Sequence, residues 1–222
     1  VKKGEKIMLC GASGSGKSTL LRLLKRELSP RGELSGNITL MGKDRSELSD
    51  RESAEKIGFV MQSPDSQTVC DKVSAELAFG LESFGVKSGE IQSRVGEMAA
   101  FFGIEPLYDR DISTLSGGQK QLVALCSVMA TDPDILLLDE PTAQLDPVAA
   151  RELLGILDRL NKEMGVTIII AEHDPEELFD SCDKILYLAK GKTEFFGTPA
   201  LTAKYFVENA LEGFLPETAK AF

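Results

Sequence analysis

A glycine-rich segment set between two apolar segments constrains the fold of this chain more than any other feature. Residues Gly11–Thr19 fit the pattern G-x-x-x-x-G-K-[ST]. The apolar run Lys6–Cys10 before them predicts a strand, and the leucines after them predict a helix from about Gly16 to Leu28. In that setting, successive backbone N–H groups curl around an anion, and the helix N-terminus adds a partial positive charge. The segment, called the phosphate loop below, therefore predicts a nucleotide-binding α/β domain.

Each residue type in the phosphate loop has its own expected task. Lys17 is expected to reach the β and γ phosphates, and Ser18 is expected to offer its hydroxyl to Mg²⁺. An ordinary glycine-rich turn is the alternative, but the strand, the helix and the Lys-Ser pair together favour a phosphate site. The nucleotide-binding residues predicted here are Gly11, Ser13, Gly14, Ser15, Gly16, Lys17, Ser18 and Thr19.

Two adjacent acids, Asp139 and Glu140, follow a continuous apolar run at Ile135–Leu138. Such a run is typical of a parallel strand that is buried on both faces, and ligands of open α/β sheets lie at the carboxyl ends of strands. We expect Asp139 to help hold Mg²⁺, directly or through water, and Glu140 to polarise the water that attacks the γ-phosphate. The alternative is a pair of solvated acids at the end of a strand.

Two further polar residues follow predicted strands. Gln62 comes after Lys56–Met61, and its amide is expected to bind Mg²⁺ and the attacking water, although a plain loop residue is the alternative. His173, the only histidine, comes after the buried run Val166–Ala171 and is expected near the γ-phosphate. The acids between Glu172 and Glu177 are interpreted as the solvated start of a helix, which Asp174-Pro175 would begin.

The peptide Ser116-Gly117-Gly118-Gln119 has both a structural and a functional interpretation. Ser-x-x-Gln is a capping box, which predicts a helix from Ser116 to about Ala130. A capped helix start with two glycines also exposes free N–H groups to an anion. The two interpretations are compatible. The local pattern leaves open whether the anion is bound by this chain or by another.

Strand and helix patterns alternate along the chain, which predicts a doubly wound parallel sheet. Asn37–Leu40 is a further predicted strand, and Lys184–Leu188 with Thr193–Phe196 predicts a hairpin around Gly191. A helical pattern runs from about Asp71 to Phe102. We therefore expect a core formed by residues 1–62 and 131–222, with a helical subdomain inserted at 63–130.

Composition limits the classes of function. The 222 residues are enough for one large α/β domain with a small subdomain. A formal net charge of −10 argues against a nucleic-acid partner. The four cysteines form no CxxC pair and lie in or beside apolar sequence, as reduced core thiols of a cytosolic protein do. No apolar run approaches the ~20 residues that span a bilayer, and no signal peptide is evident, so work at a membrane would need a partner.

The order of these motifs resembles the ATP-binding subunit of an ABC transporter over nearly the whole chain. The resemblance rests on the phosphate loop, Gln62, the signature peptide Leu115–Gln119, Asp139-Glu140, Ala143-Gln144-Leu145-Asp146 and His173. It implies a single ABC ATPase domain over residues 1–222, of the P-loop NTPase fold, with a RecA-like core, ATP and Mg²⁺. It implies a head-to-tail dimer in which Ser116 and Gly118, with Gly117 and Gln119 beside them, bind the γ-phosphate held by the partner, and Asp146 lies at the interface. It also implies Glu140 as the catalytic base and His173 as the γ-phosphate sensor.

A finer resemblance is to the ATPases of energy-coupling factor importers of cobalt and vitamins. It rests on Gln62–Gln67 and Glu76–Glu82, while Pro30–Gly36, Asp71–Val73 and Ala171–His173 resemble the first half of proteins with two ATPase domains. The resemblance implies import of a small nutrient at the cytoplasmic face of the membrane, with a transmembrane coupling subunit and a substrate-binding membrane subunit. The family usually begins about two strands upstream of Val1 with an adenine-stacking aromatic residue. The chain therefore resembles an N-terminally truncated form, and no adenine platform is named.

Two other hypotheses remain open from the sequence. One is a soluble ABC ATPase that acts on the ribosome or on DNA. Chromosome-structuring relatives are disfavoured because only about fifty residues without sustained heptads separate Gln62 from Ser116. The other is a non-hydrolysing regulatory half. The transported molecule, and whether the second ATPase domain is another copy, a paralogue or a continuation of this polypeptide, stay undetermined.

Overall fold

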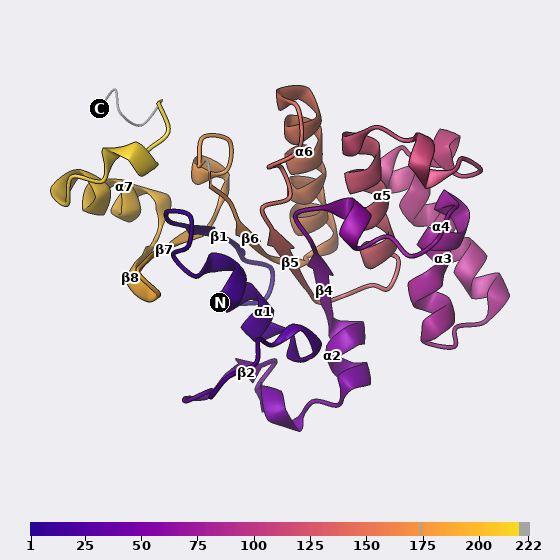
Figure 1. Ribbon diagram of the computed structural model, residues 1–222, viewed down its shortest axis with the longest axis horizontal. Helices are drawn as coiled ribbons and strands as arrows, with labels where there is room; N and C mark the ends of the chain where they lie inside the picture. The colour runs from indigo at the N-terminus through magenta and orange to yellow at the C-terminus, as the bar shows by residue number, and fades with distance from the viewer. Residues whose placement is uncertain (174, 218–222) are drawn as a thin grey trace.

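A six-stranded sheet in the order β4-β5-β6-β1-β7-β8 forms the centre of the molecule. The computed structural model (Figure 1) describes residues 1–173 and 175–217. The first five strands in this order are parallel, and β8 runs antiparallel to β7, as the hairpin pattern predicts. The strands are β1 (Lys6–Cys10), β4 (Ile57–Val60), β5 (Ile135–Asp139), β6 (Thr167–Ala171), β7 (Lys184–Ala189) and β8 (Lys192–Gly197).

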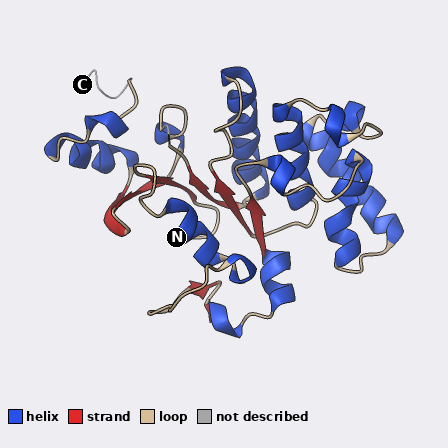
Figure 2. Ribbon diagram, viewed as in Figure 1, coloured by secondary structure: helices blue, strands red, loops and turns tan. Residues whose placement is uncertain are grey.

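Helices cover both faces of this sheet, so each central strand is buried on both sides (Figure 2). Successive strand residues alternate between two cores: Leu136 and Leu138 pack in one, and Leu137 packs in the other. The first core includes side chains of α6 (Pro147–Met164) and α7 (Pro199–Glu208). The second includes Leu21 of α1 (Lys17–Leu24). Burial on both faces explains why the strands are continuous apolar runs.

Three helices lie between β4 and β5 in the chain and pack together at one end of the molecule, on the right in Figure 1. They are α3 (Val73–Ser83), α4 (Ser88–Phe102) and α5 (Gly117–Met129). Helix α5 also packs on the sheet at Gly58, where a Cβ would lie 2.5 Å from the Cγ1 of Val128. This helical group is thus held directly against strand β4.

Three elements of the N-terminal half differ from the sequence-based expectation. Helix α1 ends at Leu24 rather than near Leu28, and a 3-10 turn at Arg26–Leu28 follows it. Strand β2 (Thr39–Leu40) pairs only with β3 (Lys43–Asp44) in a separate two-stranded sheet. Helix α2 (Asp50–Lys56) is absent from the expectation, although it begins with a capping box.

The prediction of a helix that starts at Asp174-Pro175 is wrong for the described residues. Asp174 lies outside them, and the chain after Pro175 makes turns and a 3-10 helix at Phe179–Ser181. Leu178 and Phe179 are adjacent and both buried, with exposed fractions of 2% and 1%. A tight turn buries two neighbouring side chains together, whereas an amphipathic helix buries residues three or four apart. Helix α7, further along, was not expected from the sequence.

Candidate functional site

Four parallel strands end at the same edge of the sheet, and the predicted site residues follow them. The register pairs Leu9 with Ala171, and Ala171 with Asp139, so β1, β6 and β5 end side by side. Gly11 follows β1, Glu140 follows β5 and His173 comes after β6, while Gln62 follows β4 on the outer side of β5. The fold therefore gathers segments that are far apart in the sequence, and ligands of open α/β sheets bind at this edge.

The phosphate loop adopts a backbone that glycine permits. Gly11, Gly14 and Gly16 have φ angles of 148°, 77° and 105°. A Cβ at Gly11 would lie 2.2 Å from the carbonyl oxygen of Leu188, so only glycine fits there. Within the described part of the chain, Ser15 Oγ is a buried polar atom without a hydrogen-bond partner. An unsatisfied hydroxyl in a curled, glycine-lined loop fits a bound phosphate oxygen.

Lys17 lies in the first turn of α1, only 4% exposed, with its ammonium directed at the loop. Its Nζ donates a hydrogen bond to Gly11 O at 2.9 Å and lies 3.6 Å from Glu140 Oε1. A buried ammonium needs acceptors or an opposite charge. This lysine therefore stands between the loop and the carboxylate after β5. Ser13 and Thr19, by contrast, are exposed.

An oxygen pair that suits Mg²⁺ lies beside this lysine. Ser18 Oγ donates to Asp139 Oδ1 at 2.7 Å, and Asp139 is 5% exposed. Arg22 Nη2 lies 3.8 Å from Asp139 Oδ2. Among the described residues, no group of three or more His, Cys, Asp or Glu side chains forms a metal cluster. One hydroxyl and one carboxylate fit Mg²⁺, which usually takes one or two carboxylates and completes its shell with water and substrate phosphates.

Glu140 and Gln62 meet from neighbouring strands. Gln62 Nε2 donates to Glu140 Oε2 at 3.3 Å. Glu140 has φ 47°, and its N–H donates to Ala171 O at 2.9 Å. Non-glycine residues rarely adopt positive φ, and such strain is typical of functional sites. The Gln67 amide clasps the end of β4 through Met61 N–H (2.9 Å) and Phe59 O (3.1 Å), a role that no sequence pattern signalled.

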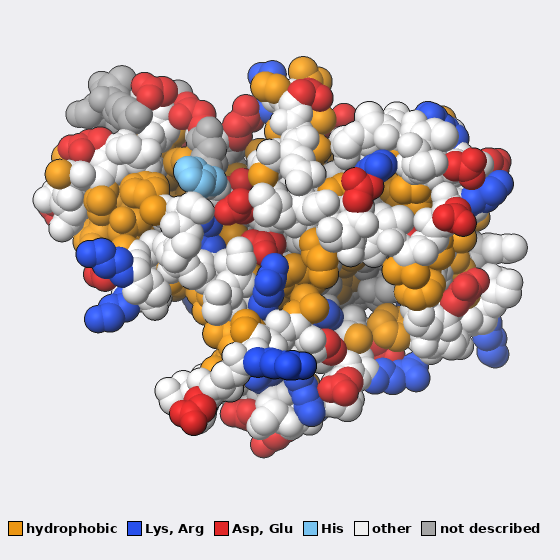
Figure 3. Space-filling view, in the orientation of Figure 1, with side chains coloured by type: hydrophobic (Ala, Val, Ile, Leu, Met, Phe, Trp, Pro, Cys, Tyr) orange, Lys and Arg blue, Asp and Glu red, His pale blue; other side chains and the backbone are white. Residues whose placement is uncertain are grey.

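The acidic residue that precedes His173 is not solvated as the sequence suggested. Glu172 is 4% exposed, and its Oε1 accepts hydrogen bonds from the Thr142 N–H (3.2 Å) and Oγ1 (2.8 Å). Burial raises the pKa of Glu172 to about 7, against the lowering effect of those hydrogen bonds. The strand pattern could not reveal this, because the side chain is covered by a loop 30 residues earlier. His173 itself is exposed (Figure 3).

The signature peptide Leu115–Gln119 caps α5 as predicted. Gln119 N–H donates to Ser116 Oγ at 3.3 Å, and Ser116 N–H donates to Gln119 Oε1 at 3.0 Å. Ser116 and Gly117 are exposed. No hydrogen bond or ion pair among the described residues joins 116–119 to the phosphate loop. The structure therefore does not bring the signature peptide onto this chain's own loop.

Asp146 begins α6. Its carboxylate accepts hydrogen bonds from Val148 N–H (2.9 Å) and Ala149 N–H (3.1 Å), which hold the pKa of Asp146 below its usual range. In this chain the residue is a helix cap on the surface. Both Asp146 and the signature peptide thus present polar, capped helix starts outward.

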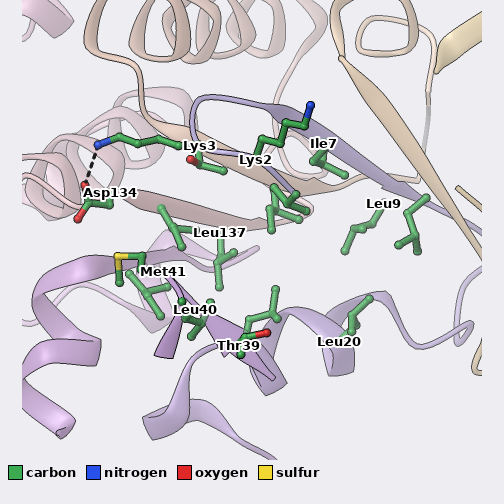
Figure 4. A pocket seen from close by; sticks show the side chains of 18 of the residues that line it. Lys2, Lys3, Ile7, Leu9, Leu20, Thr39, Leu40, Met41, Asp134 and Leu137 are labelled. Carbon is green, nitrogen blue, oxygen red and sulfur yellow. Dashed lines mark ion pairs between the residues drawn. The ribbon is translucent and has the colours of Figure 1, made fainter. Parts of the chain in front are cut away.

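A mainly apolar cavity lies elsewhere in the described part of the chain (Figure 4). It measures about 890 Å³ and is bounded by Ile7, Leu9 and Leu137 of the sheet and by Leu40 and Met41 near β2. Its walls are mainly apolar, so they offer few groups to a triphosphate. No helix in the described ranges is both long enough and apolar enough to cross a membrane.

Comparison with known proteins agrees with this arrangement. A family model described as ABC transporter matches residues 1–143. A putative ABC transporter ATP-binding protein of Bacillus thuringiensis is 43% identical over 223 residues, and one of Methanosarcina mazei is 43% identical over 202. The alignments cover 100% and 90% of this chain but 40% and 34% of those proteins. The chain thus spans less than half the length of these relatives.

Two solved structures resemble the whole domain. CbiO1 of Clostridium perfringens, part of the ABC transporter complex CbiONQ, has a TM-score of 0.83 and 34% identity, covering 100% of this chain and 88% of that one. A dimeric ATP-binding cassette in a post-hydrolysis state with ADP and Pi has a TM-score of 0.76 and 28% identity, covering 90% and 87%. The resemblance and the fold that it implies are confirmed. The chain belongs to the ABC transporter family, as an ATP-binding domain.

Proposed function

We propose that this domain powers import of a small nutrient, a vitamin or a metal ion, through separate transmembrane subunits at the cytoplasmic face of the membrane. The likeness to CbiO1, part of a CbiONQ complex, supports an energy-coupling factor type, and so does the sequence Gln62–Gln67. The observation that carries the proposal is the meeting of Lys17, the Ser18–Asp139 pair and the Gln62–Glu140 pair at one edge of the sheet.

The nucleotide half of the mechanism follows from this edge. Backbone N–H groups of the phosphate loop and the Lys17 ammonium bind the β and γ phosphates, where negative charge increases during phosphoryl transfer. Ser18 and Asp139 would hold Mg²⁺, which neutralises charge on the phosphate oxygens when it is bound. Lys17 exchanges its contact with Glu140 for the phosphate, which leaves the carboxylate to the attacking water.

The hydrolytic half uses groups on three neighbouring strands. Glu140 accepts the proton of the attacking water, and the Gln62 amide orients that water from β4. His173, exposed at the end of β6, donates a hydrogen bond to the γ-phosphate. Because phosphoryl transfer needs mainly positioning and charge stabilisation, no covalent intermediate with the chain is required.

A second ATPase domain completes the site in this proposal. Ser116, Gly117, Gly118 and Gln119 lie at an exposed helix start that this chain's phosphate loop does not use. In a head-to-tail sandwich, this start would bind the γ-phosphate held by the partner's phosphate loop, with Asp146 at the interface. ATP would join the two domains, and hydrolysis would let them separate. The partner is a second copy, a paralogue or a fused domain.

Motion would reach the membrane subunits through the helical subdomain, which we place at residues 63–130. The Lys120 ammonium lies 2.6 Å from the Asp65 carboxylate, which ties the first turn of α5 to the segment after Gln62. Gln121 Nε2 donates to Met61 O at 3.4 Å. A shift of Gln62 on loss of the γ-phosphate would therefore move α5 and the helices packed on it.

Replacement of Glu140 tests the proposal most directly. In the full-length protein, Glu140→Gln is expected to bind ATP, to stop turnover and to hold the paired domains together in ATP. Lys17→Ala should prevent that association, because it removes the phosphate contact. Turnover that survives Glu140→Gln would remove Glu140 from its role. Purification with ribosomes, and without any membrane subunit, would contradict the transporter assignment.

A further inference from the structure

Glu172 lies at the junction of the two loops that follow the central strands. Its N–H donates to Leu9 O at 3.2 Å, at the end of β1. The preceding residue, Ala171, accepts the N–H of Glu140 at 2.9 Å. The backbone at 171–172 therefore bridges the strand that leads into the phosphate loop and the strand that carries Glu140. A side chain at this point is placed to hold both neighbouring loops.

The Glu172 carboxylate bonds one of these neighbouring loops. It is almost completely buried, and Oε1 accepts both the N–H and the hydroxyl of Thr142, at 3.2 and 2.8 Å. Burying a carboxyl group is costly unless its hydrogen bonds are made. These bonds span 30 residues of sequence and join the loop after β6 to the loop after β5. The buried acid thus has a specific tertiary partner.

Thr142 lies in the middle of the segment from Glu140 to Asp146. Ala143 N–H donates to Glu140 O at 3.2 Å, and Leu145 N–H donates to Thr142 O at 3.0 Å. The segment ends at the carboxylate that caps α6. A hold on Thr142 therefore fixes the path of the chain between the proposed base and the proposed interface residue.

We propose that Glu172 is a positioning residue of the ATPase site. Its carboxyl group holds the loop after β6, which contains His173, against the loop after β5, which contains Thr142. It does not act on the nucleotide itself. It fixes the positions of Glu140, His173 and Asp146 relative to one another. The proposed base, the γ-phosphate contact and the interface residue therefore move as one unit. The inference rests on the roles proposed above for those three residues.

Loss of the carboxylate has a defined consequence. Glu172→Ala removes the acceptor and leaves the Thr142 N–H without its partner, so the loop after β5 is free to shift. Because the loop that shifts carries Glu140, kcat is expected to fall by about tenfold or more. Within the described ranges, no hydrogen bond or ion pair joins Glu172 to Lys17 or to the phosphate loop. The KM for ATP should therefore stay within about twofold.

The experiment compares six single variants, and the Glu172→Ala/Thr142→Val double variant, by steady-state ATP hydrolysis in the full-length protein. Glu172→Gln keeps an oxygen acceptor of the same shape and should retain most of kcat, whereas Glu172→Ala should not. Thr142→Ser keeps the hydroxyl donor. Thr142→Val removes that donor and should lower kcat less than Glu172→Ala does. Thr202→Val is the control, because the Thr202 hydroxyl, in α7, is buried and donates a hydrogen bond to Thr198 O at 2.9 Å. Glu140→Gln serves as the reference for the proposed base.

The outcomes separate the inference from the function on which it rests. A lowered kcat in Glu172→Ala, rescued by Gln, supports the inference if Glu172→Ala and Thr142→Val are not additive when combined. Equal losses in the Ala and Gln variants would overturn it, and so would wild-type turnover in folded Glu172→Ala. An equal loss of kcat in Thr202→Val would overturn the inference, because the effect would then reflect general destabilisation. Turnover that survives Glu140→Gln would refute the proposed base instead. If Glu172→Ala fails to fold, the Thr142 pair and the Gln variant still decide.

Discussion

The phosphate loop and the signature peptide are both glycine-rich helix starts, yet they are built in opposite ways. The phosphate loop depends on distant contacts: Gly11 lies against Leu188, Lys17 beside Glu140, and Ser18 bonds Asp139. The signature peptide satisfies its own groups within four residues, through Ser116 and Gln119.

This difference fits the proposal that one chain carries two halves of different sites. The loop side is assembled by the tertiary fold and depends on neighbouring strands for its geometry. The signature side, Leu115–Gln119, is a local motif at an exposed helix start, and its hydrogen bonds lie within the motif itself. We therefore expect substitutions on the loop side to change folding and nucleotide binding in a single domain. Substitutions on the signature side should change mainly what happens when two domains meet.

The largest expected effect is on stability and concerns Gly11→Ala. A Cβ there would meet a backbone oxygen at 2.2 Å, at a φ of 148° that alanine avoids. We expect a loss of more than about 3 kcal/mol in the free energy of unfolding, measured with urea. Gly14→Ala is the control: its φ is 77°, but no atom lies within 4 Å, so its cost should be about 1 kcal/mol. Equal losses would show that strain, not the close approach, dominates.

The next effect is a pH dependence on the loop side, through Glu172. Burial raises the pKa of this carboxyl from 4.5 to about 7, so the folded state binds a proton that the unfolded state releases. Its contribution to stability is therefore full below pH 4.5 and is lost as pH rises to about 7. At about 1.4 kcal/mol per pKa unit, the loss is at most about 3.5 kcal/mol.

Glu172→Gln cannot ionise, so its stability relative to wild type should rise between pH 5 and pH 8. Chemical unfolding at both pH values measures this difference. Other carboxyl groups titrate equally in the two proteins, so the comparison isolates position 172. A constant difference across that range would mean that Glu172 keeps an ordinary pKa in the folded protein.

The same contrast explains what the sequence could and could not predict. The phosphate loop and the cap at Ser116 have local patterns, and Asp139-Glu140 follow a recognisable buried strand. The burial of Glu172 depends on Thr142, far away in the chain, and its acidic neighbourhood suggested solvent instead. The clasp of Gln67 on Met61 also has no pattern, since it depends on how one loop folds back. In both residues, Glu172 and Gln67, the observed role depends on tertiary contacts that a local sequence pattern does not contain.

A third prediction separates the two sides by ATP binding. Lys17→Ala removes a charge-assisted phosphate contact, so the Kd of a single domain for ATP should rise roughly 10- to 100-fold. Ser116→Ala should leave that Kd unchanged and cost about 1 kcal/mol of stability through the lost helix cap. Its turnover should nevertheless fall. Titration with a fluorescent ATP analogue, at protein concentrations below association, measures both. Weaker ATP binding by Ser116→Ala would contradict a site completed by a partner.

The smallest expected effect on stability is also the sharpest test of the signature side. Gly117 lies in the first turn of α5, and a Cβ there would have its nearest neighbour, Gln144 O, at 3.9 Å. Gly117→Ala should therefore stabilise the fold by about 0.5 kcal/mol, since alanine restricts the unfolded chain. Gly89→Ala, in the first turn of α4 with open space around it, is the matched control. Both variants should melt slightly higher, but only Gly117→Ala should lose turnover, because its methyl group stands where a partner's phosphate would approach the helix start. Full turnover in Gly117→Ala would mean that this helix start receives no phosphate.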